Sequence, residues 1–384
     1  MSRRQVASTS PEHLNSFAAN VLIQDPLCSH TLRGVVYHRK QPAGRETGSA
    51  PPQASRACPC YTTNVISTFR LVFFGTPEFA VPSLRALLAG SDPVVGVVCQ
   101  PDKPAGRGRH LATPPVKQVA LEAQVPVLQP EKLRPPEFPE ALRQWAPDLI
   151  VVAAYGKILP KAALDLPPHG CINVHASLLP KYRGAAPIQW AILRGEAVTG
   201  VTIMQMNERM DAGDILLQRE TRIGEDETYG ELQARLADVG AQALIEAIAQ
   251  LHAGTLQAQR QREEDVTLAP MIAKENGRID WTQPAVVIAR MVRAFNPWPS
   301  AFTDLDGKLL KIHRAHVGGA GTGIPGNVAC VEGDIAVSTG DGTLVLDELQ
   351  LEGRKRLSAA EFARGGGIKV GTVLGSATPE EMRV

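Results

Sequence analysis

The sequence predicts an α/β protein with two domains. Between residues 70 and 221, short apolar strands alternate with helices, which is the pattern of a mainly parallel sheet covered by helices on both faces. After residue 295, short strands follow one another closely, separated by turns such as Asp306-Gly307 and Gly340-Asp-Gly342. This spacing is typical of a small antiparallel barrel. With 384 residues, we expect two domains: a Rossmann-like, mainly parallel sheet domain and a small C-terminal β-barrel. Barrels of the oligonucleotide-binding type have this profile, but periodicity does not separate them from other small barrels.

The strands of the first domain are expected at apolar runs bounded by glycine, proline or polar residues. These runs lie at 70–74, 94–99, 126–128, 148–153, 171–174, 199–206 and 214–221. Helices should alternate with the strands: the first runs up to Ala89, and the others lie at 115–123, 137–145 and 184–194. Pro77 or Pro82 falls in the first turn of the first helix, where a missing N–H costs little.

The clearest helix spans Tyr229–Leu251 and closes the first domain. Thr228 and Glu231 form the T-x-x-E pattern of a capping box at its start, and Gly254 follows its end, where glycine is favoured. Apolar residues recur at steps of three to five positions and make one stripe: Leu232, Leu236, Val239, Leu244, Ile248 and Leu251. This helix is predicted to serve architecture rather than chemistry.

Composition divides the chain into four parts. Residues 1–68 are rich in Ser, Pro, Arg, His and Gln without sustained periodicity, so a disordered N-terminal extension is predicted there. Its basic, Ser-containing start is the pattern of a transit peptide, but Glu12, Asp25 and Glu46 argue against one. A misassigned start codon explains the segment at least as well, and no function is assigned to it. The sheet domain is expected at 69–256 and a polar, charged linker at 257–275. The barrel domain, with a helix at 284–294, is expected at 276–384.

Charge and cysteine content narrow the classes of protein that the chain can belong to. The net charge is +1, so contacts with nucleic acid must come from local patches. Aromatic residues make up only 5%, which disfavours a surface built by repeated base stacking. Cys99 and Cys171 lie in apolar strands and are predicted to be core thiols. The spacing of Cys58-Pro-Cys60 does not predict a zinc site. Without an apolar run long enough to cross a membrane, a soluble, cytoplasmic protein is expected.

Polar side chains gather at the predicted end of strand 171–174. Asn173 and His175 are two residues apart, so they point to the same side of an extended backbone. Ligands bind at the carboxyl ends of strands in open parallel sheets. Alone, such a pair is more often two satisfied hydrogen-bonding groups than a catalytic site. A carboxylate is added by Asp211 in the loop Met210–Asp214, although an Asp near a glycine is usually turn chemistry.

An Asn, a His and an Asp at one sheet edge, without a Ser or Cys nucleophile elbow, suit direct acyl transfer. The Asn amide can donate to a developing oxyanion, and loss of one such donor typically costs ~3 kcal/mol. A protonated His adds a second donor, while the Asp orients the His and passes protons through water. Dinucleotide binding is not predicted, because Gly75-Thr-Pro77 stands where a G-x-G-x-x-G pattern would be.

A long loop, Gln100–Pro114, carries a group of cationic side chains. Lys103, Arg107, Arg109 and His110 lie within eight consecutive residues. Long loops in compact domains are usually functional or disordered. Because the whole chain is nearly neutral, this local charge indicates an anionic partner.

Together these residues resemble the folate-dependent formyltransferases. The match runs from about residue 69 to the C-terminus and leaves 1–68 uncovered. The segments that carry it are Phe74-Gly-Thr-Pro77, Pro101-Asp-Lys-Pro-Ala-Gly-Arg-Gly108, Asn173-Val-His175, Ser177-Leu-Leu-Pro-Lys-Tyr-Arg-Gly184, Ala185-Ala-Pro-Ile-Gln-Trp190, Met210-Asp-Ala-Gly-Asp214 and Phe295-Asn-Pro-Trp-Pro299. The sequence departs from the family at Asn207-Glu-Arg209, where an Asp and a Gly are more usual.

The resemblance implies a function and a role for several residues. It implies formyl transfer from 10-formyltetrahydrofolate to methionylated initiator tRNA, in the cytoplasm, by a monomer that needs no metal. The basic loop would enter the acceptor stem and the barrel would follow the tRNA backbone. The implied roles are catalysis for Asn173, His175 and Asp211; folate binding for Ala154, Tyr155, Gly156, Ile158, Ser177, Leu178, Leu179 and Pro180; and tRNA contact for Lys103, Arg107 and Arg109.

Three other functions compete with this one. Formylation of a nucleotide-linked amino sugar would use the same trio, and only the basic loop and the barrel favour tRNA. A glycinamide ribonucleotide formyltransferase would carry a Gly-x-Gly-Ser-Asn turn where this chain has Gly75-Thr-Pro-Glu78. A non-catalytic RNA-binding module would not need Asn173, His175 and Asp211.

Overall fold

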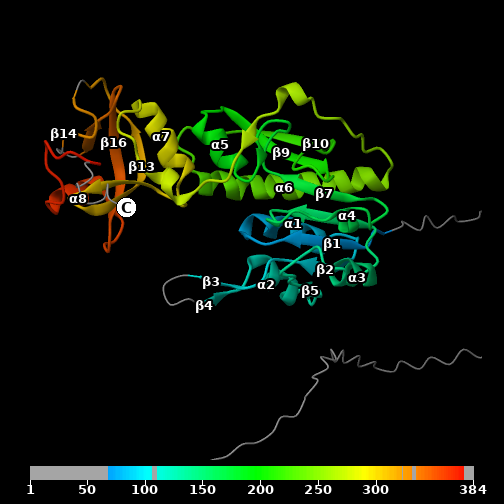
Figure 1. Cartoon of the computed structure of the whole chain (residues 1–384). Coiled ribbons are helices and arrows are strands. Elements are labelled where there is room, and N and C mark those ends of the chain that lie inside the picture. Colours follow the sequence, from blue (N-terminus) through cyan, green and yellow to red (C-terminus); the bar gives the residue numbers. More distant parts are fainter. Residues whose placement is uncertain (1–67, 106–109, 322, 331–333, 376–384) are drawn as a thin grey trace, which may run out of the picture. The chain divides into compact units, whose positions relative to one another are not determined.

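A seven-stranded sheet forms the centre of the first domain in the computed structural model, which describes residues 68–105, 110–321, 323–330 and 334–375 (Figure 1). The strand order is β10 (Ile215–Arg222), β9 (Val198–Gln205), β7 (Cys171–His175), β6 (Leu149–Ala153), β1 (Leu71–Gly75), β2 (Val94–Val98) and β5 (Val127–Leu128). The strands from β7 to β5 run parallel, and β9 is antiparallel to both of its neighbours. The predicted α/β class and mainly parallel sheet are confirmed.

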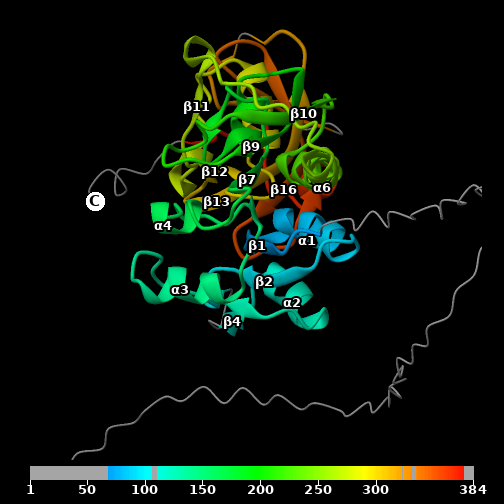
Figure 2. The same ribbon diagram turned by 90° about the vertical axis from the view of Figure 1, so that its right-hand side faces the viewer.

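Helices cover both faces of this sheet, because successive side chains of its buried strands point to opposite sides. Leu71 and Phe73 of β1 belong to one apolar core, and Val72 and Phe74 belong to another. The first core is covered by α1 (Val81–Leu88), α2 (Pro115–Glu122), α5 (Pro187–Leu193) and α6 (Tyr229–His252); the second is covered by α3 (Glu137–Gln144) and α4 (Lys161–Leu164) (Figure 2). A short 3-10 helix, η1 (Glu78–Ala80), precedes α1.

Helix α6 begins with the predicted capping box. The Thr228 hydroxyl accepts from the Glu231 N–H at 3.4 Å, and the Glu231 carboxylate accepts from the Thr228 N–H at 2.8 Å. Four members of the predicted stripe are buried, and Val239 and Leu251 pack partly buried against the same core. Gly254 follows the end of the helix with φ +66°, a conformation that favours glycine.

The segment predicted as one long loop contains a hairpin. Strands β3 (Lys103–Ala105) and β4 (His110–Ala112) pair antiparallel, with Lys103 opposite Ala112. Asp102, at the base of the hairpin, ion-pairs with Lys117 at 2.8 Å and accepts from Gln129 at 2.8 Å. These two hydrogen bonds lower the pKa of Asp102. The hairpin therefore leaves the sheet domain from a fixed base.

The C-terminal domain is built on a curled antiparallel sheet of six strands, a half-barrel that agrees with the predicted small antiparallel barrel. It begins with a helix, α7 (Ala285–Ala294), and contains a further helix that was not predicted, α8 (Ala359–Arg364). The strands are β12 (Ala301–Leu305), β13 (Lys308–Val317), β16 (Thr343–Leu351), β15 (Ile335–Ser338) and β14 (Val328–Cys330), in that order, with β17 (Leu357–Ser358) paired to β16. Its core contains Trp281, whose indole N–H donates to Thr303 at 3.0 Å.

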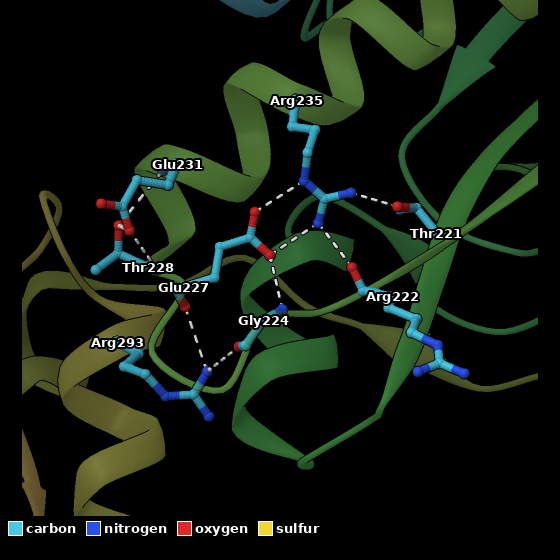
Figure 3. A network of polar contacts seen from close by, with 8 residues as sticks. All are labelled: Thr221, Arg222, Gly224, Glu227, Thr228, Glu231, Arg235 and Arg293. Carbon is cyan, nitrogen blue, oxygen red and sulfur yellow. Dashed lines mark hydrogen bonds and ion pairs between the residues drawn. The ribbon is translucent and has the colours of Figure 1, made fainter.

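The turn before α6 is held by residues of the second domain. Arg293 of α7 donates to the carbonyl oxygens of Gly224 and Glu227, both at 3.3 Å, while Arg235 of α6 pairs with the Glu227 carboxylate at 2.8 Å (Figure 3). Arg314 of β13 reaches the Glu231 carboxylate at 2.6 Å. The start of α6 is thus a point where the two domains meet.

The predicted linker follows a packed course along the first domain. Gln259 exchanges two backbone hydrogen bonds of 2.8 Å with Ile215 of β10. Further on, β11 (Leu268–Ala269) pairs in parallel with β8 (Arg183–Gly184). Two 3-10 helices, η2 (Glu263–Asp265) and η3 (Lys274–Gly277), complete the segment. Across the described part of the chain, no helix combines the length and apolarity needed to cross a membrane.

Candidate active site

His175 ends strand β7, which lies between β6 and β9. Its ring is 6% exposed, and Nε2 lies 3.0 Å from the carbonyl oxygen of Tyr182. A carbonyl oxygen can only accept, so Nε2 carries the hydrogen of this bond. The other ring nitrogen, Nδ1, lies 3.8 Å from Oδ1 of Asp211. Nδ1 is therefore the ring nitrogen that the Tyr182 carbonyl does not engage.

Asp211 comes from the turn after β9, far from His175 in the sequence but close in space. Its Oδ2 accepts from the Gly184 N–H at 2.9 Å, which leaves Oδ1 facing the imidazole. Asp211 has φ +49°, a left-handed conformation that costs a residue with a side chain roughly 1–2 kcal/mol. Such strain persists only where the surrounding contacts hold the residue in place.

Asn173 stands two residues before His175 on β7, so the two side chains leave the strand on the same side. It is half-buried, whereas its neighbours Ile172 and Val174 are buried in the core. The structure thus brings His175 and Asp211 together, and the alternation of side chains along β7 puts Asn173 on the same face of the strand as His175.

The segment after β7 is a tight turn fixed by hydroxyl and amide groups. Ser177 donates to the carbonyl of Lys181 at 2.6 Å, while Thr202 of β9 donates to the Ser177 carbonyl at 2.6 Å and accepts from the Leu179 N–H at 3.1 Å. Ser177 and Leu179 are buried by these contacts. Among the predicted folate residues here, Leu178 and Pro180 keep part of their surface exposed.

The segment after β6 presents a second predicted folate surface beside the first. Ala154 and Gly156 are exposed, and Ile158 is 78% exposed. The Tyr155 ring points the other way: it is 2% exposed and packs edge-on against Phe74. The Tyr155 carbonyl accepts from Gln100 at 2.8 Å and Thr76 at 3.3 Å. Of the predicted folate residues in this segment, Ala154, Gly156 and Ile158 therefore have exposed side chains or backbone, whereas the Tyr155 ring does not.

The predicted tRNA contacts are described only in part. Lys103 is exposed at the start of β3, and its ammonium donates to the Gln100 side chain at 3.0 Å. Arg107 and Arg109 lie outside the described residues. Their roles remain predictions.

The two buried thiols of the first domain are poor nucleophiles. Burial raises the pKa of Cys99 to about 11 and that of Cys171 to about 12. Both are therefore protonated at neutral pH and belong to the core, as predicted. In the stretches that the structure describes, no three His, Cys, Asp or Glu side chains are grouped so that they could hold a metal ion.

The burial of two polar residues near Asp211 was not predicted from the sequence. Gln261 and Arg183 are both 5% exposed and hydrogen-bond to each other at 3.0 Å. Gln261 lies within a charged segment, and nothing in its sequence neighbourhood marks it as buried. Only the tertiary pairing of Gln259 with Ile215 places it beside Asp211.

Comparison with known proteins agrees with this fold. Residues 69–248 match the formyl transferase family, and residues 271–367 match the formyl transferase C-terminal domain. Methionyl-tRNA formyltransferase of Geobacter sulfurreducens is 50% identical over 310 residues, 80% of this chain and 97% of that protein. The Myxococcus xanthus enzyme of the same name is 53% identical over 304 residues, 79% of this chain and 97% of that protein.

Solved structures with lower sequence identity share the fold. HypX of Aquifex aeolicus in complex with tetrahydrofolic acid is 20% identical with a TM-score of 0.53, covering 77% of this chain and 47% of that one. An N-formyltransferase of Helicobacter canadensis in complex with folinic acid and dTDP-3-aminofucose is 18% identical with a TM-score of 0.55. The match covers 73% of this chain and 99% of that one.

The fold and the two matched domains define a formyl transferase, which confirms the class that the sequence predicts. Within that class, the chain belongs to the methionyl-tRNA formyltransferase family, at about half identity over nearly the whole length of its relatives.

Proposed function

We propose that the protein transfers the formyl group of 10-formyltetrahydrofolate to the free α-amino group of methionyl-initiator tRNA. The product is N-formylmethionyl-tRNA for translation initiation. The observation that carries this proposal is the identity of about 50% to methionyl-tRNA formyltransferases over 97% of their length. Conserved fold alone would not choose the acceptor, because sugar N-formyltransferases share the fold.

The exposed surfaces beside β6 and β7 fit the formyl donor. Ile158, Leu178 and Pro180 offer apolar contacts, and the backbone at Ala154 and Gly156 is open to a flat heterocycle. Pockets for such ligands are mainly apolar with a few fixed polar groups. The polar groups here are Asn173 and His175, at the end of the adjacent strand.

In the proposed reaction, the α-amine of the methionyl group attacks the formyl group directly. The α-amine is neutral in a useful fraction near pH 7, since α-amino pKa values lie around 8. Its nitrogen bonds to the formyl carbon, and the formyl oxygen becomes an oxyanion. Asn173 donates to that oxyanion, and His175, when protonated, donates through Nδ1 because Nε2 is engaged by Tyr182. The opposing Asp211 carboxylate, 3.8 Å away, stabilises the charged ring.

The tetrahedral intermediate then collapses and releases tetrahydrofolate. The bond between the formyl carbon and N10 breaks, and its electron pair goes to N10. A water held by Asp211 takes the proton lost by the attacking amine and delivers a proton to N10. No enzyme nucleophile takes part, in keeping with the protonated state of the Cys99 and Cys171 thiols.

One comparison of acceptors tests the proposal. Labelled 10-formyltetrahydrofolate is supplied with methionylated initiator tRNA or with a nucleotide-linked amino sugar. Wild-type protein should formylate the tRNA, and His175→Ala should lower kcat about 10²–10³-fold, as expected for loss of one oxyanion donor.

The control for the histidine substitution is His169→Ala. His169 is exposed and precedes the opposite end of β7, so activity should be retained. Wild-type protein that formylated only the amino sugar, or neither acceptor, would contradict the proposal.

A further inference from the structure

Gln261 is a buried amide that uses all of its hydrogen-bonding side-chain atoms around the Asp211 turn. Its Nε2 donates to the carbonyl oxygens of Asp211 at 2.9 Å and Gly213 at 2.7 Å. Its Oε1 accepts from Nε of Arg183 at 3.0 Å. A side-chain amide with two donors and one acceptor engaged in this way fixes the backbone that it bridges.

The segment that carries Gln261 is laid against the sheet domain by its backbone. The paired backbones of Gln259 and Ile215 set its register at the start of β10. Beyond Gln261, Glu263 pairs with Arg183 at 3.3 Å and with Arg209 at 3.4 Å. The segment thus contacts residues on both sides of the Asp211 turn.

Asp211 is therefore held at two points. Its carboxylate accepts from the Gly184 N–H, and its carbonyl accepts from Gln261. The two holding groups are connected, because Arg183 precedes Gly184 in the chain and donates to Gln261. The turn itself passes close to β9: a Cβ added at Gly213 would lie 1.7 Å from the Gln205 carbonyl oxygen. Any movement of the turn would displace the carboxylate from Nδ1 of His175.

We propose that Gln261 is a positioning residue for formyl transfer, acting through Asp211. The amide of Gln261 keeps Asp211 in its left-handed conformation with Oδ1 facing His175. The segment that joins the two domains thereby supplies part of the active-site frame. The activity readouts below rest on the proposed function, whereas the amide-exchange readout is independent of any substrate.

Two variants distinguish the effect of losing the hydrogen-bond donors of Gln261 from the effect of changing its size. Gln261→Met keeps the approximate volume but lacks the amide donors and the carbonyl acceptor, and Gln261→Glu keeps an acceptor for Arg183 but loses both donors. Each should lower kcat about ten- to hundredfold, because small displacements of catalytic groups have effects of this size. KM for 10-formyltetrahydrofolate should stay unchanged. Gln259→Ala is the matched control, since this exposed glutamine lies two residues away and should leave kcat at the wild-type value.

A double-mutant cycle with Asp211→Asn tests whether the effect passes through Asp211. The losses caused by Gln261→Met and Gln261→Glu should shrink to less than about threefold in the Asp211→Asn background, because coupled residues are not additive. Equal losses in both backgrounds would overturn the proposal, as would wild-type kcat in both variants.

Hydrogen exchange at the Gly184 amide gives a second, substrate-free test. This N–H is protected by the Asp211 carboxylate, so its exchange should accelerate at least tenfold in Gln261→Met and Gln261→Glu while exchange in α6 stays unchanged. Wild-type protection of Gly184, or a global loss of structure in both variants, would contradict a positioning role. If the wild-type protein were inactive on tRNA, the proposed function would fail, and the exchange result alone would decide the role of Gln261.

Discussion

The phenol group of Tyr155 lies in the apolar core of the first domain. Its oxygen is buried and has no partner among the described residues, while its ring lies in the core with Phe74 and Phe138. Burial raises the pKa of Tyr155 to about 12, so the hydroxyl stays neutral and unsatisfied. A buried polar group without a partner costs free energy that a phenyl ring would not.

Tyr155→Phe should therefore leave the free energy of unfolding unchanged or raise it by about 1 kcal/mol. Chemical denaturation checks this. The matched control is Tyr182→Phe, because the Tyr182 hydroxyl donates to the Glu196 carboxylate at 2.6 Å. Loss of that bond should destabilise the protein by about 1.5–3 kcal/mol. An equal loss in both variants would show that the Tyr155 hydroxyl has a stabilising partner.

At the scale of residues, the sequence predicts what depends on local geometry. Asn173 and His175 share one side because side chains alternate along a strand. The sequence could not predict which ring nitrogen of His175 is hydrogen-bonded. This depends on the carbonyl of Tyr182, which lies in a turn that Thr202 of another strand holds in place. The contact of Gln261 with Asp211 likewise depends on pairing between distant segments.

At the start of α6, one carboxylate both caps the helix and contacts the second domain. Glu231 accepts from the backbone and hydroxyl of Thr228 and pairs with Arg314. These bonds, the Thr228 backbone bond first, lower the pKa of Glu231 from 4.5 to about 2. A lowered carboxyl pKa means that the stabilisation is present above pH 4.5 and is lost as the pH falls toward 2.

Glu231→Gln should accordingly lower the free energy of unfolding at pH 7. The difference from wild type should shrink as the pH is lowered from 4.5 toward 2, because the wild-type carboxylate is then protonated. Denaturation between pH 3 and 7 measures it. Glu225→Gln, an exposed glutamate before the helix, serves as the control. A difference that stayed constant across this range would exclude the charge of Glu231 as its source.

At the scale of elements, helices and strands with a strong apolar pattern can be predicted from the sequence, whereas very short strands cannot. The buried strands and α6 follow from their apolar patterns. The hairpin of β3 and β4 does not, because each strand has three residues and one contains Pro104, which lacks a backbone N–H. Helix α8 did carry a readable signal: Ser358 and Glu361 form the same kind of capping box as Thr228 and Glu231.

Across the whole molecule, a net charge of +1 leaves little general attraction for tRNA. On the proposed function, tRNA binding must then depend on local cations such as those predicted in the segment 103–110. Asp102, just before this segment, is held by Lys117 and Gln129. Arg107 falls between the two hairpin strands in sequence, although it lies outside the described residues.

Arg107→Ala should lower kcat/KM for tRNA by about tenfold or more, the effect of losing a contact worth roughly 1–3 kcal/mol. KM for 10-formyltetrahydrofolate and the melting temperature should not change. Steady-state kinetics with each substrate varied in turn separates these effects. Arg85→Ala, on the exposed side of α1, is the control. Unchanged catalytic efficiency with tRNA would remove Arg107 from the interface.

The packed course of residues 259–269 has a consequence for how this protein can be recombined. The boundary predicted at residue 256 separates two folding patterns in the sequence, yet Gln261 and β11 lie beyond it and contact the Asp211 turn and β8. A hybrid with a breakpoint at 256 would take Asp211 from one parent protein and the segment that contacts the Asp211 turn from the other. Modular exchange of the C-terminal domain is therefore constrained to junctions after Ala269, where the borrowed part no longer contributes to the frame of the active site.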